Sequence, residues 1–111
     1  MSDKADRKSE GKPLVQLIEP EFILGIGAVL EMGARKYAPN NWKLSVNTED
    51  HKAFVDDRQG SMIRHAMARL SGELRDVESG LPHMYHVACN AMFIDFYDDE
   101  QSHRGGINDI P

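Results

Sequence analysis

The 111-residue sequence has little of what marks several common classes of protein. Its one cysteine, Cys89, excludes an internal disulfide framework and a zinc site built from cysteines. No apolar run approaches the roughly 18 residues that a membrane-spanning helix needs. The stretch from Met1 to Lys12 is polar and lacks the apolar centre of a secretory signal. We therefore expect a soluble protein of the reducing cytoplasm, without a membrane partner.

The sequence also has fewer basic than acidic residues. The chain has 13 Lys and Arg residues against 18 Asp and Glu residues, which gives a net charge of −5 when the histidines are neutral. A protein that coats nucleic acid without sequence preference needs a basic surface to displace counterions. The composition therefore argues against direct binding of nucleic acid.

The sequence has almost none of the alternating, β-branched pattern that indicates strands. Apolar residues instead recur at helical spacing in three segments. Pro20 suits the first turn of a helix, and Pro39 disfavours helix at the residue before it. Gly72 and the polar stretch that follows it mark the end of the middle segment. The pattern predicts helices over residues 20–37, about 56–74 and about 82–97, with a short helical turn in residues 48–55.

These elements form one domain over residues 14–100, between a disordered arm (residues 1–13) and a flexible tail (residues 101–111). Three helices make a marginal core in a chain this small. The third helix is apolar around most of its circumference, which indicates burial on several sides. We predict an all-α helical bundle that completes its core by forming a homodimer or homotetramer.

Two of the predicted helices carry polar side chains beside their apolar faces. His65, Arg69 and Glu73 are spaced by four residues, so they share one face of the middle helix. The third helix has a second polar line, formed by His83, His86 and Asn90. One interpretation of both lines is ordinary surface pairing, worth about 0.2–0.5 kcal/mol for each pair.

The alternative interpretation of the polar lines is a metal site. The linker between the two helices is short, so they must run antiparallel, and the end of one meets the start of the other. Carboxylates suit Mg²⁺ or Mn²⁺, and imidazoles suit Mn²⁺ better than Mg²⁺. The candidate metal ligands are Glu73, Asp76, His83 and His86.

A second group of polar residues lies where the first helix ends, in the sequence GARKYAPNNWK (residues 33–43). One interpretation is a nucleotide contact, in which Lys36, Arg35 or Lys43 offsets phosphate charge and Tyr37 or Trp42 stacks on a base. Asn41 and, from the third helix, Asn90 are then candidates for reading the base. The alternative is a helix end with cations against its dipole, followed by a turn and a tryptophan that fills the core.

The run LIEPEFILGIGAVLEMGARKYAPNNW (residues 17–42), followed by RHAMARLSGELRDVESGLPHMYHVACNAMF (residues 64–93), resembles the MazG-like dATP/dGTP diphosphohydrolases of phages and bacteria. The resemblance covers about residues 14–97. It implies an all-α fold assembled as a dimer or tetramer. It also implies hydrolysis of a purine (d)NTP, such as dGTP, GTP or dATP, to the monophosphate and pyrophosphate with Mg²⁺ or Mn²⁺. In a phage, this activity would adjust the nucleotide pool in the host cytoplasm before DNA synthesis.

The sequence departs from the commoner MazG pattern, which has Glu-Glu-x-x-Glu on one helix and Glu-x-x-Asp on the next. Here Glu73-x-x-Asp76 comes late on the middle helix, and His83-x-x-His86 stands where the acidic pair is expected. The resemblance therefore implies the fold and the reaction more directly than the ligands.

For the reaction, Glu73, Asp76 and His86 are the candidate catalytic residues, holding the ions that activate a water. Arg64, Arg69 or Lys36 would stabilise the charge of the departing pyrophosphate. Two other functions remain open. One is a non-catalytic helical interaction module, in which the polar lines fix the register between subunits. The other is a nucleotide phosphohydrolase with a different cleavage pattern.

Overall fold

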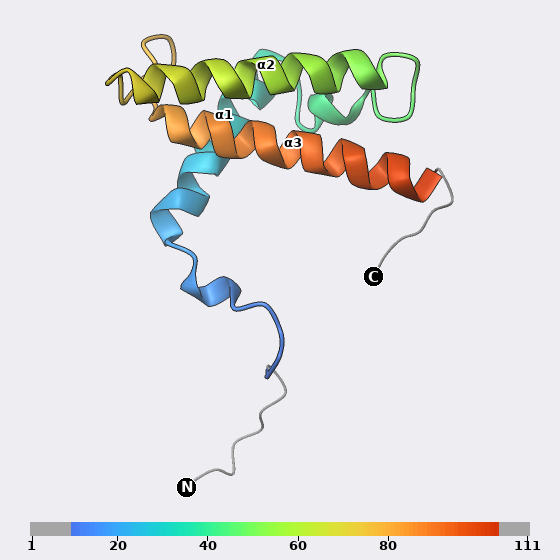
Figure 1. Ribbon diagram of the computed structural model, residues 1–111, viewed down its shortest axis with the longest axis horizontal. Coiled ribbons are helices and arrows are strands. Elements are labelled where there is room, and N and C mark those ends of the chain that lie inside the picture. Colours follow the sequence, from blue (N-terminus) through green and yellow to red (C-terminus); the bar gives the residue numbers. More distant parts are fainter. Residues whose placement is uncertain (1–9, 105–111) are drawn as a thin grey trace, which may run out of the picture.

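The computed structural model describes residues 10–104, and it confirms the predicted all-α bundle (Figure 1). The three helices are α1 (Pro20–Lys36), α2 (His51–Leu70) and α3 (His83–Arg104), with 3-10 turns η1 (Val15–Leu17) and η2 (Asn41–Lys43). Within residues 10–104 the nearest approach to a sheet is one isolated bridge between Arg75 and Pro82. Among these helices, none combines the length and apolarity needed to cross a bilayer.

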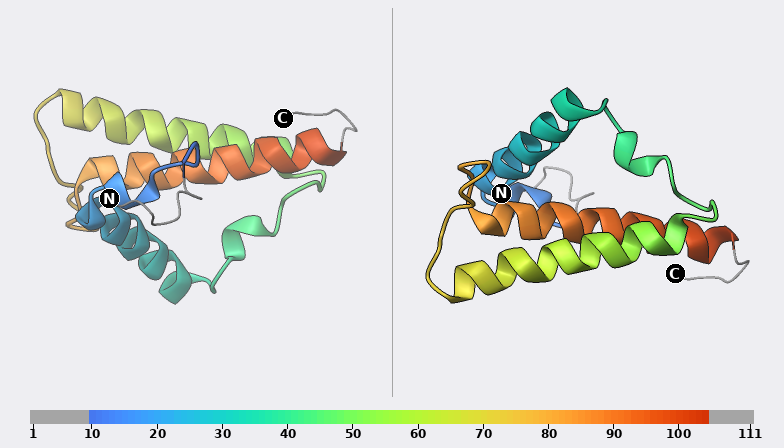
Figure 2. Two further views of the ribbon diagram at one scale, coloured as in Figure 1. Left: turned by 90° about the horizontal axis from the view of Figure 1, so that it is seen from below. Right: turned by 90° about the horizontal axis from the view of Figure 1, so that it is seen from above.

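Helices α2 and α3 run antiparallel side by side, as the short linker predicts (Figure 1). Helix α1 packs on α3 and leaves it at an angle, and the chain returns through η2 to the start of α2 (Figure 2). Residues from α1, η2, α2 and α3 line one shared pocket. The chain path therefore places the two polar groups found in the sequence around the same space.

The predicted helix boundaries need correction. Helix α2 covers residues 51–70 rather than 56–74, because Gly72 adopts a φ of 106°, which ends the helical path before Glu73. Helix α3 continues to Arg104 rather than ending near residue 97, so residues 101–104 of the predicted tail are helical. Residues 1–9 of the predicted arm and 105–111 of the tail lie outside the described residues.

The core lies where η2 and α2 meet α3. Tyr97 is fully buried, donates a hydrogen bond of 2.5 Å to the carbonyl oxygen of Trp42, and stacks on Phe54 with ring centroids 4.5 Å apart. Burial raises the pKa of the Tyr97 phenol, so this donor keeps its proton. Cys89 is buried as predicted, and burial raises the pKa of its thiol to about 11. The described cysteine is therefore a small hydrophobic core residue.

Helix α1 approaches α3 closely at a glycine. A Cβ atom at Gly25 would collide with the ring of Tyr85, and that ring also makes an edge-on contact with Phe22 at 5.9 Å. The absence of a side chain at Gly25 therefore allows the two helices to cross at this point.

Much apolar surface remains uncovered in one protomer. Among the described hydrophobic residues, only Cys89 and Tyr97 fall in the buried class. A run of large apolar side chains is exposed on η1 and the first half of α1: Leu14, Val15, Leu17, Ile18, Phe22, Ile23 and Leu24. An exposed apolar surface of this size is typical of a surface that contacts another molecule.

Candidate metal and nucleotide site

The loop between α2 and α3 is held tightly by hydrogen bonds. The amide of Asp76 donates to the carbonyl of Leu81 (2.8 Å), and the amide of Gly80 donates to the carbonyl of Asp76 (2.7 Å). The guanidinium of Arg75 adds a bond to the carbonyl of Gly80 (3.0 Å). Gly80 adopts a φ of 75°, which favours glycine at this turn. The loop therefore presents Asp76 and its neighbours to the start of α3 in a fixed orientation.

Three imidazoles gather beside this loop. Nδ1 of His65 lies 2.8 Å from Nδ1 of His83, and the ring of His65 stacks on that of His86 with centroids 4.3 Å apart. One potential ligand atom from each of His65, Asp76 and His83 lies within 4.8 Å of the other two. The structure thus brings the end of α2, the loop and the start of α3 to one small volume.

Glu73 contacts the opposite side of the His83 ring. Oε1 of Glu73 lies 2.9 Å from Nε2 of His83. The side chain of His83 is almost fully buried. An ionised carboxylate only accepts hydrogen bonds, so Nε2–H of His83 donates and the lone pair of a neutral ring lies on Nδ1. That lone pair faces His65 and the cluster. A carboxylate behind a ligating imidazole is the usual arrangement for orienting a metal-binding histidine.

Ser79 connects the remaining two members of the cluster. Its amide donates to Oδ2 of Asp76 (2.8 Å), and its hydroxyl lies 2.8 Å from Nε2 of His86. The same hydroxyl oxygen accepts a hydrogen bond from the amide of Leu81 (3.1 Å). Ser79 therefore fixes the carboxylate and the imidazole together.

The electrostatics of the cluster suit a cation. Burial, together with the charge of the neighbouring histidines, lowers the pKa of both His65 and His86, so the two rings are neutral at neutral pH. Burial alone would raise the pKa of Asp76, but the hydrogen bonds from Ser79 and the nearby His86 and His65 lower it below its usual value. Neutral imidazoles and an ionised carboxylate are the protonation states that bind metals.

The donor set therefore fits a divalent ion with some affinity for nitrogen. Two imidazoles and one carboxylate converge, and a third imidazole lies beside them. Such mixed sets suit Mn²⁺ and later first-row ions, whereas Mg²⁺ favours oxygen ligands. Glu73, expected as a ligand, is placed behind His83, where it can orient that ring.

The cluster forms one end of a pocket of about 1060 Å³, at the upper end of the roughly 300–1,000 Å³ usual for small-molecule sites. Along α2, the lining residues include Phe54, Arg58, Ser61 and His65. Along α3 they include His83, His86, Asn90 and Phe93. Both series change from imidazole, through polar groups, to aromatic rings. The pocket therefore has one end with potential metal ligands and one aromatic end.

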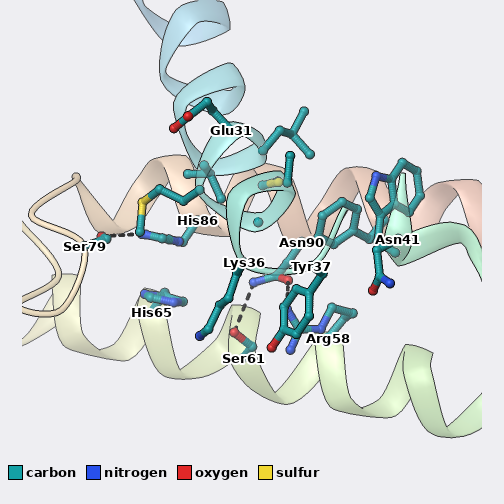
Figure 3. A pocket seen from close by; sticks show the side chains of 18 of the residues that line it. Glu31, Lys36, Tyr37, Asn41, Arg58, Ser61, His65, Ser79, His86 and Asn90 are labelled. Atoms are coloured by element: carbon teal, nitrogen blue, oxygen red, sulfur yellow. Dashed lines mark hydrogen bonds between the residues drawn. The ribbon is translucent and has the colours of Figure 1, made fainter. Parts of the chain in front are cut away.

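Most of the predicted substrate-binding residues line this pocket: Lys36, Tyr37, Asn41, Trp42, Arg64 and Asn90. Figure 3 shows Lys36 and Tyr37 extending into it from the end of α1. The ring of Trp42 packs on Phe93 at 4.5 Å and Phe96 at 5.2 Å, so Trp42 fills the core and also borders the pocket. The packing of Trp42 agrees with the interpretation in which it fills the core, and the nucleotide contact stays a prediction.

Arg69 is placed elsewhere. Its side chain lines a separate small depression with Leu70 and Met84, away from the large pocket. The expected face of His65, Arg69 and Glu73 does not form, because the helix ends at Leu70 and Glu73 turns back toward His83. A shared face for Arg69 and Glu73 requires a continuous helix, and the helix is interrupted before Gly72.

Three residues of the site were not selected from the sequence as ligands or substrate contacts. His65 joins the metal cluster, Ser79 connects Asp76 with His86, and Arg58 lines the pocket beside Asn90. The spacing of seven residues between Arg58 and His65 places them on one face of α2, and this signal was present in the sequence.

Fold and site together define a small helical domain with a pocket that ends in a cluster of potential metal ligands. The chain matches the dATP/dGTP diphosphohydrolase, N-terminal, family over residues 2–104, and it belongs to that family. The resemblance found in the sequence is thus confirmed.

The chain is also 29% identical over 85 residues to a dATP/dGTP diphosphohydrolase of Salmonella phage PMBT28. The aligned region covers 77% of this chain and 27% of the relative. The chain therefore spans about a quarter of that relative's length. No solved structure matches the chain.

Proposed function

We propose that this protein is a metal-dependent nucleoside triphosphate diphosphohydrolase that converts a purine (d)NTP to the monophosphate and pyrophosphate. The observation that carries the proposal is the convergence of His65, Asp76 and His83 at one end of a pocket whose other end is aromatic. The family and the name of the phage relative support hydrolysis of a purine nucleotide. In a phage, the reaction would deplete one purine triphosphate before DNA synthesis.

His65, Asp76 and His83 would hold the Mg²⁺ or Mn²⁺ ion, with Mn²⁺ favoured by the imidazoles. When bound, the ion offsets phosphate charge and lowers the pKa of a coordinated water. Glu73 keeps His83 in the orientation and tautomer that ligation requires. Arg64 and Lys36 line the adjoining wall, where their charges would bind the triphosphate and favour departure of pyrophosphate.

His86 is placed to accept a proton. When its Nε2–H donates to the Ser79 hydroxyl, the lone pair of the neutral ring lies on Nδ1. Water would then attack the α-phosphorus and pass its proton to Nδ1 of His86. The bond between the α-phosphorus and the oxygen bridging to the β-phosphorus breaks, and pyrophosphate leaves with the electron pair. Tyr37 and Trp42 would contact the base at the other end of the pocket.

We also propose that the active form is a homodimer or homotetramer. The exposed apolar run on η1 and α1 is much larger than the isolated apolar residues that a monomer surface carries. Covering it with a second copy would complete a core in which few hydrophobic residues are buried. Sedimentation analysis tests this assembly, and a monomer at micromolar concentration would contradict it.

The function is tested by incubating the purified protein with each dNTP and Mn²⁺ or Mg²⁺, and separating the products by ion-exchange chromatography. Purine monophosphate with pyrophosphate is the expected result. Free phosphate or tripolyphosphate would show a different cleavage, and no product from any dNTP would favour a non-catalytic interaction module. Asp76→Asn should remove turnover, whereas Lys52→Met, a change at an exposed α2 residue outside the pocket, should leave it unchanged.

A further inference from the structure

Asn90 lies in the middle of the pocket and is almost fully buried, with 4% of its surface exposed. Its Oδ1 accepts a hydrogen bond from Nη1 of Arg58 (3.2 Å), and its Nδ2 donates to Oγ of Ser61 (3.2 Å) (Figure 3). A guanidinium has no acceptor, so the carbonyl of the amide must face Arg58. The orientation of the Asn90 amide is therefore fixed by its two partners.

Arg58 lies at a distance from the cluster of potential metal ligands. It precedes His65 by seven residues on one face of α2, a distance of about 10 Å along the helix axis. The guanidinium is also paired with the carboxylate of Asp57 at 2.6 Å, which offsets its charge. An arginine that is distant from the cation site and already neutralised suits the uncharged base of a nucleotide better than its phosphates.

Both residues keep unused hydrogen-bonding groups at the pocket. Arg58 has five N–H groups, of which one is donated to Asn90 and one to Asp57, while Nε is buried without a partner. Each terminal nitrogen therefore retains an N–H group. Asn90 retains one N–H group of Nδ2 and one lone pair of Oδ1. The pair thus offers donors and one acceptor side by side.

We propose that Arg58 and Asn90 read the Hoogsteen edge of the purine, which carries N7 and the group at position 6. This inference rests on the proposed function. The free N–H of Asn90 donates to N7, which adenine and guanine share as an acceptor. At position 6, Oδ1 of Asn90 accepts from the amino group of adenine, whereas Arg58 donates to the oxygen of guanine. Pyrimidines lack N7 and leave the remaining N–H group of Asn90 without an acceptor.

The first test uses the unmodified protein with 7-deaza-dGTP and 7-deaza-dATP, in which a carbon replaces N7. The expected kcat/KM is about tenfold lower than for dGTP and dATP, which corresponds to the loss of one buried hydrogen bond. Equal kcat/KM for the deaza and natural nucleotides would overturn the inference while leaving the proposed function intact. Failure to hydrolyse any dNTP would overturn the proposed function, and this inference with it.

The second test compares Arg58→Met with Lys52→Met, which removes a cation from the exposed face of the same helix. The Arg58 variant should lose about tenfold more kcat/KM with dGTP than with dATP, because only guanine needs the donor at position 6. The Lys52 variant should keep the ratio of the unmodified protein. An equal loss for both purines would refute the role of Arg58. If Arg58→Met does not fold, the unmodified protein is given the deoxyribonucleoside triphosphate of 2-aminopurine, which lacks a group at position 6. Its kcat/KM should be about tenfold lower than that of dGTP, and an equal value would refute the contact at position 6.

Discussion

Oε1 of Glu73, near the start of the α2–α3 loop, lies 2.9 Å from Nε2 of His83 at the start of α3, although the two residues are 10 positions apart in the sequence. The contact forms because α2 ends at Leu70 and the chain turns back, so the carboxylate reaches the start of α3. It leaves Nδ1 of His83 facing His65. Glu73 is therefore a positioning residue for a candidate ligand, and this role can be separated experimentally from ligation.

Glu73→Gln should weaken Mn²⁺ binding by about 10–100-fold without abolishing it, because the loss of an orienting carboxylate has this effect at metal sites. Titration of Mn²⁺ followed by electron paramagnetic resonance measures the affinity directly. Glu49→Gln, at an exposed residue of the loop before α2, is the matched control. Complete loss of binding in the Glu73 variant would instead identify Glu73 as a ligand, and unchanged affinity would remove its role.

Mn²⁺ should raise the melting temperature more than Mg²⁺ at the same concentration, because a ligand stabilises the fold according to its affinity and the cluster contains imidazoles. Differential scanning fluorimetry measures both shifts, and excess chelator should reverse them. His83→Gln should remove the difference between the ions. A larger shift with Mg²⁺ would contradict a nitrogen-rich site.

The free energy of unfolding should fall as the pH is lowered from about 7.5 to about 5.5 in the absence of divalent ions. Burial lowers the pKa of His65 and His86 below the ordinary value of 6.5, so the unfolded chain binds more protons in this range. Stability is therefore lost as the pH falls through 6.5 toward the folded-state values. Urea unfolding at each pH measures the slope, and His65→Gln should make it shallower. A flat profile in the unmodified protein would refute the interpretation.

Gly25→Ala should destabilise the protein by about 1–3 kcal/mol, because the added methyl group would collide with the ring of Tyr85 and force α1 away from α3. Gly27→Ala is the matched control in the same helix, since a Cβ there meets nothing within 4 Å. That control should be neutral or stabilising by up to about 1 kcal/mol. Thermal unfolding compares the two, and equal stabilities would show that the close approach is not required.

The periodicity of apolar residues predicts three helices, and the short linker predicts that α2 and α3 run antiparallel. Apolar periodicity does not predict the end of α2 near Gly72, whose positive φ turns the chain away from the helix axis. A continuous helix would place Arg69 and Glu73 on one face, whereas Arg69 lines a separate depression and Glu73 contacts His83. His65 was not selected as a ligand, because its meeting with His83 depends on the register of two helices, which the sequence does not specify.

The segment from α1 through η2 is fastened to α3 near both of its ends, where Gly25 meets Tyr85 and where Trp42 meets Tyr97 and the neighbouring aromatic rings. Between these fastenings, residues 27–41 arch over the α2–α3 pair and supply one wall of the pocket. Because the potential metal ligands lie on α2, α3 and the loop between them, an insertion or deletion in this arch would change the width of the pocket without replacing any of them. The size of the molecule that the pocket admits can therefore vary separately from the chemistry of the cluster.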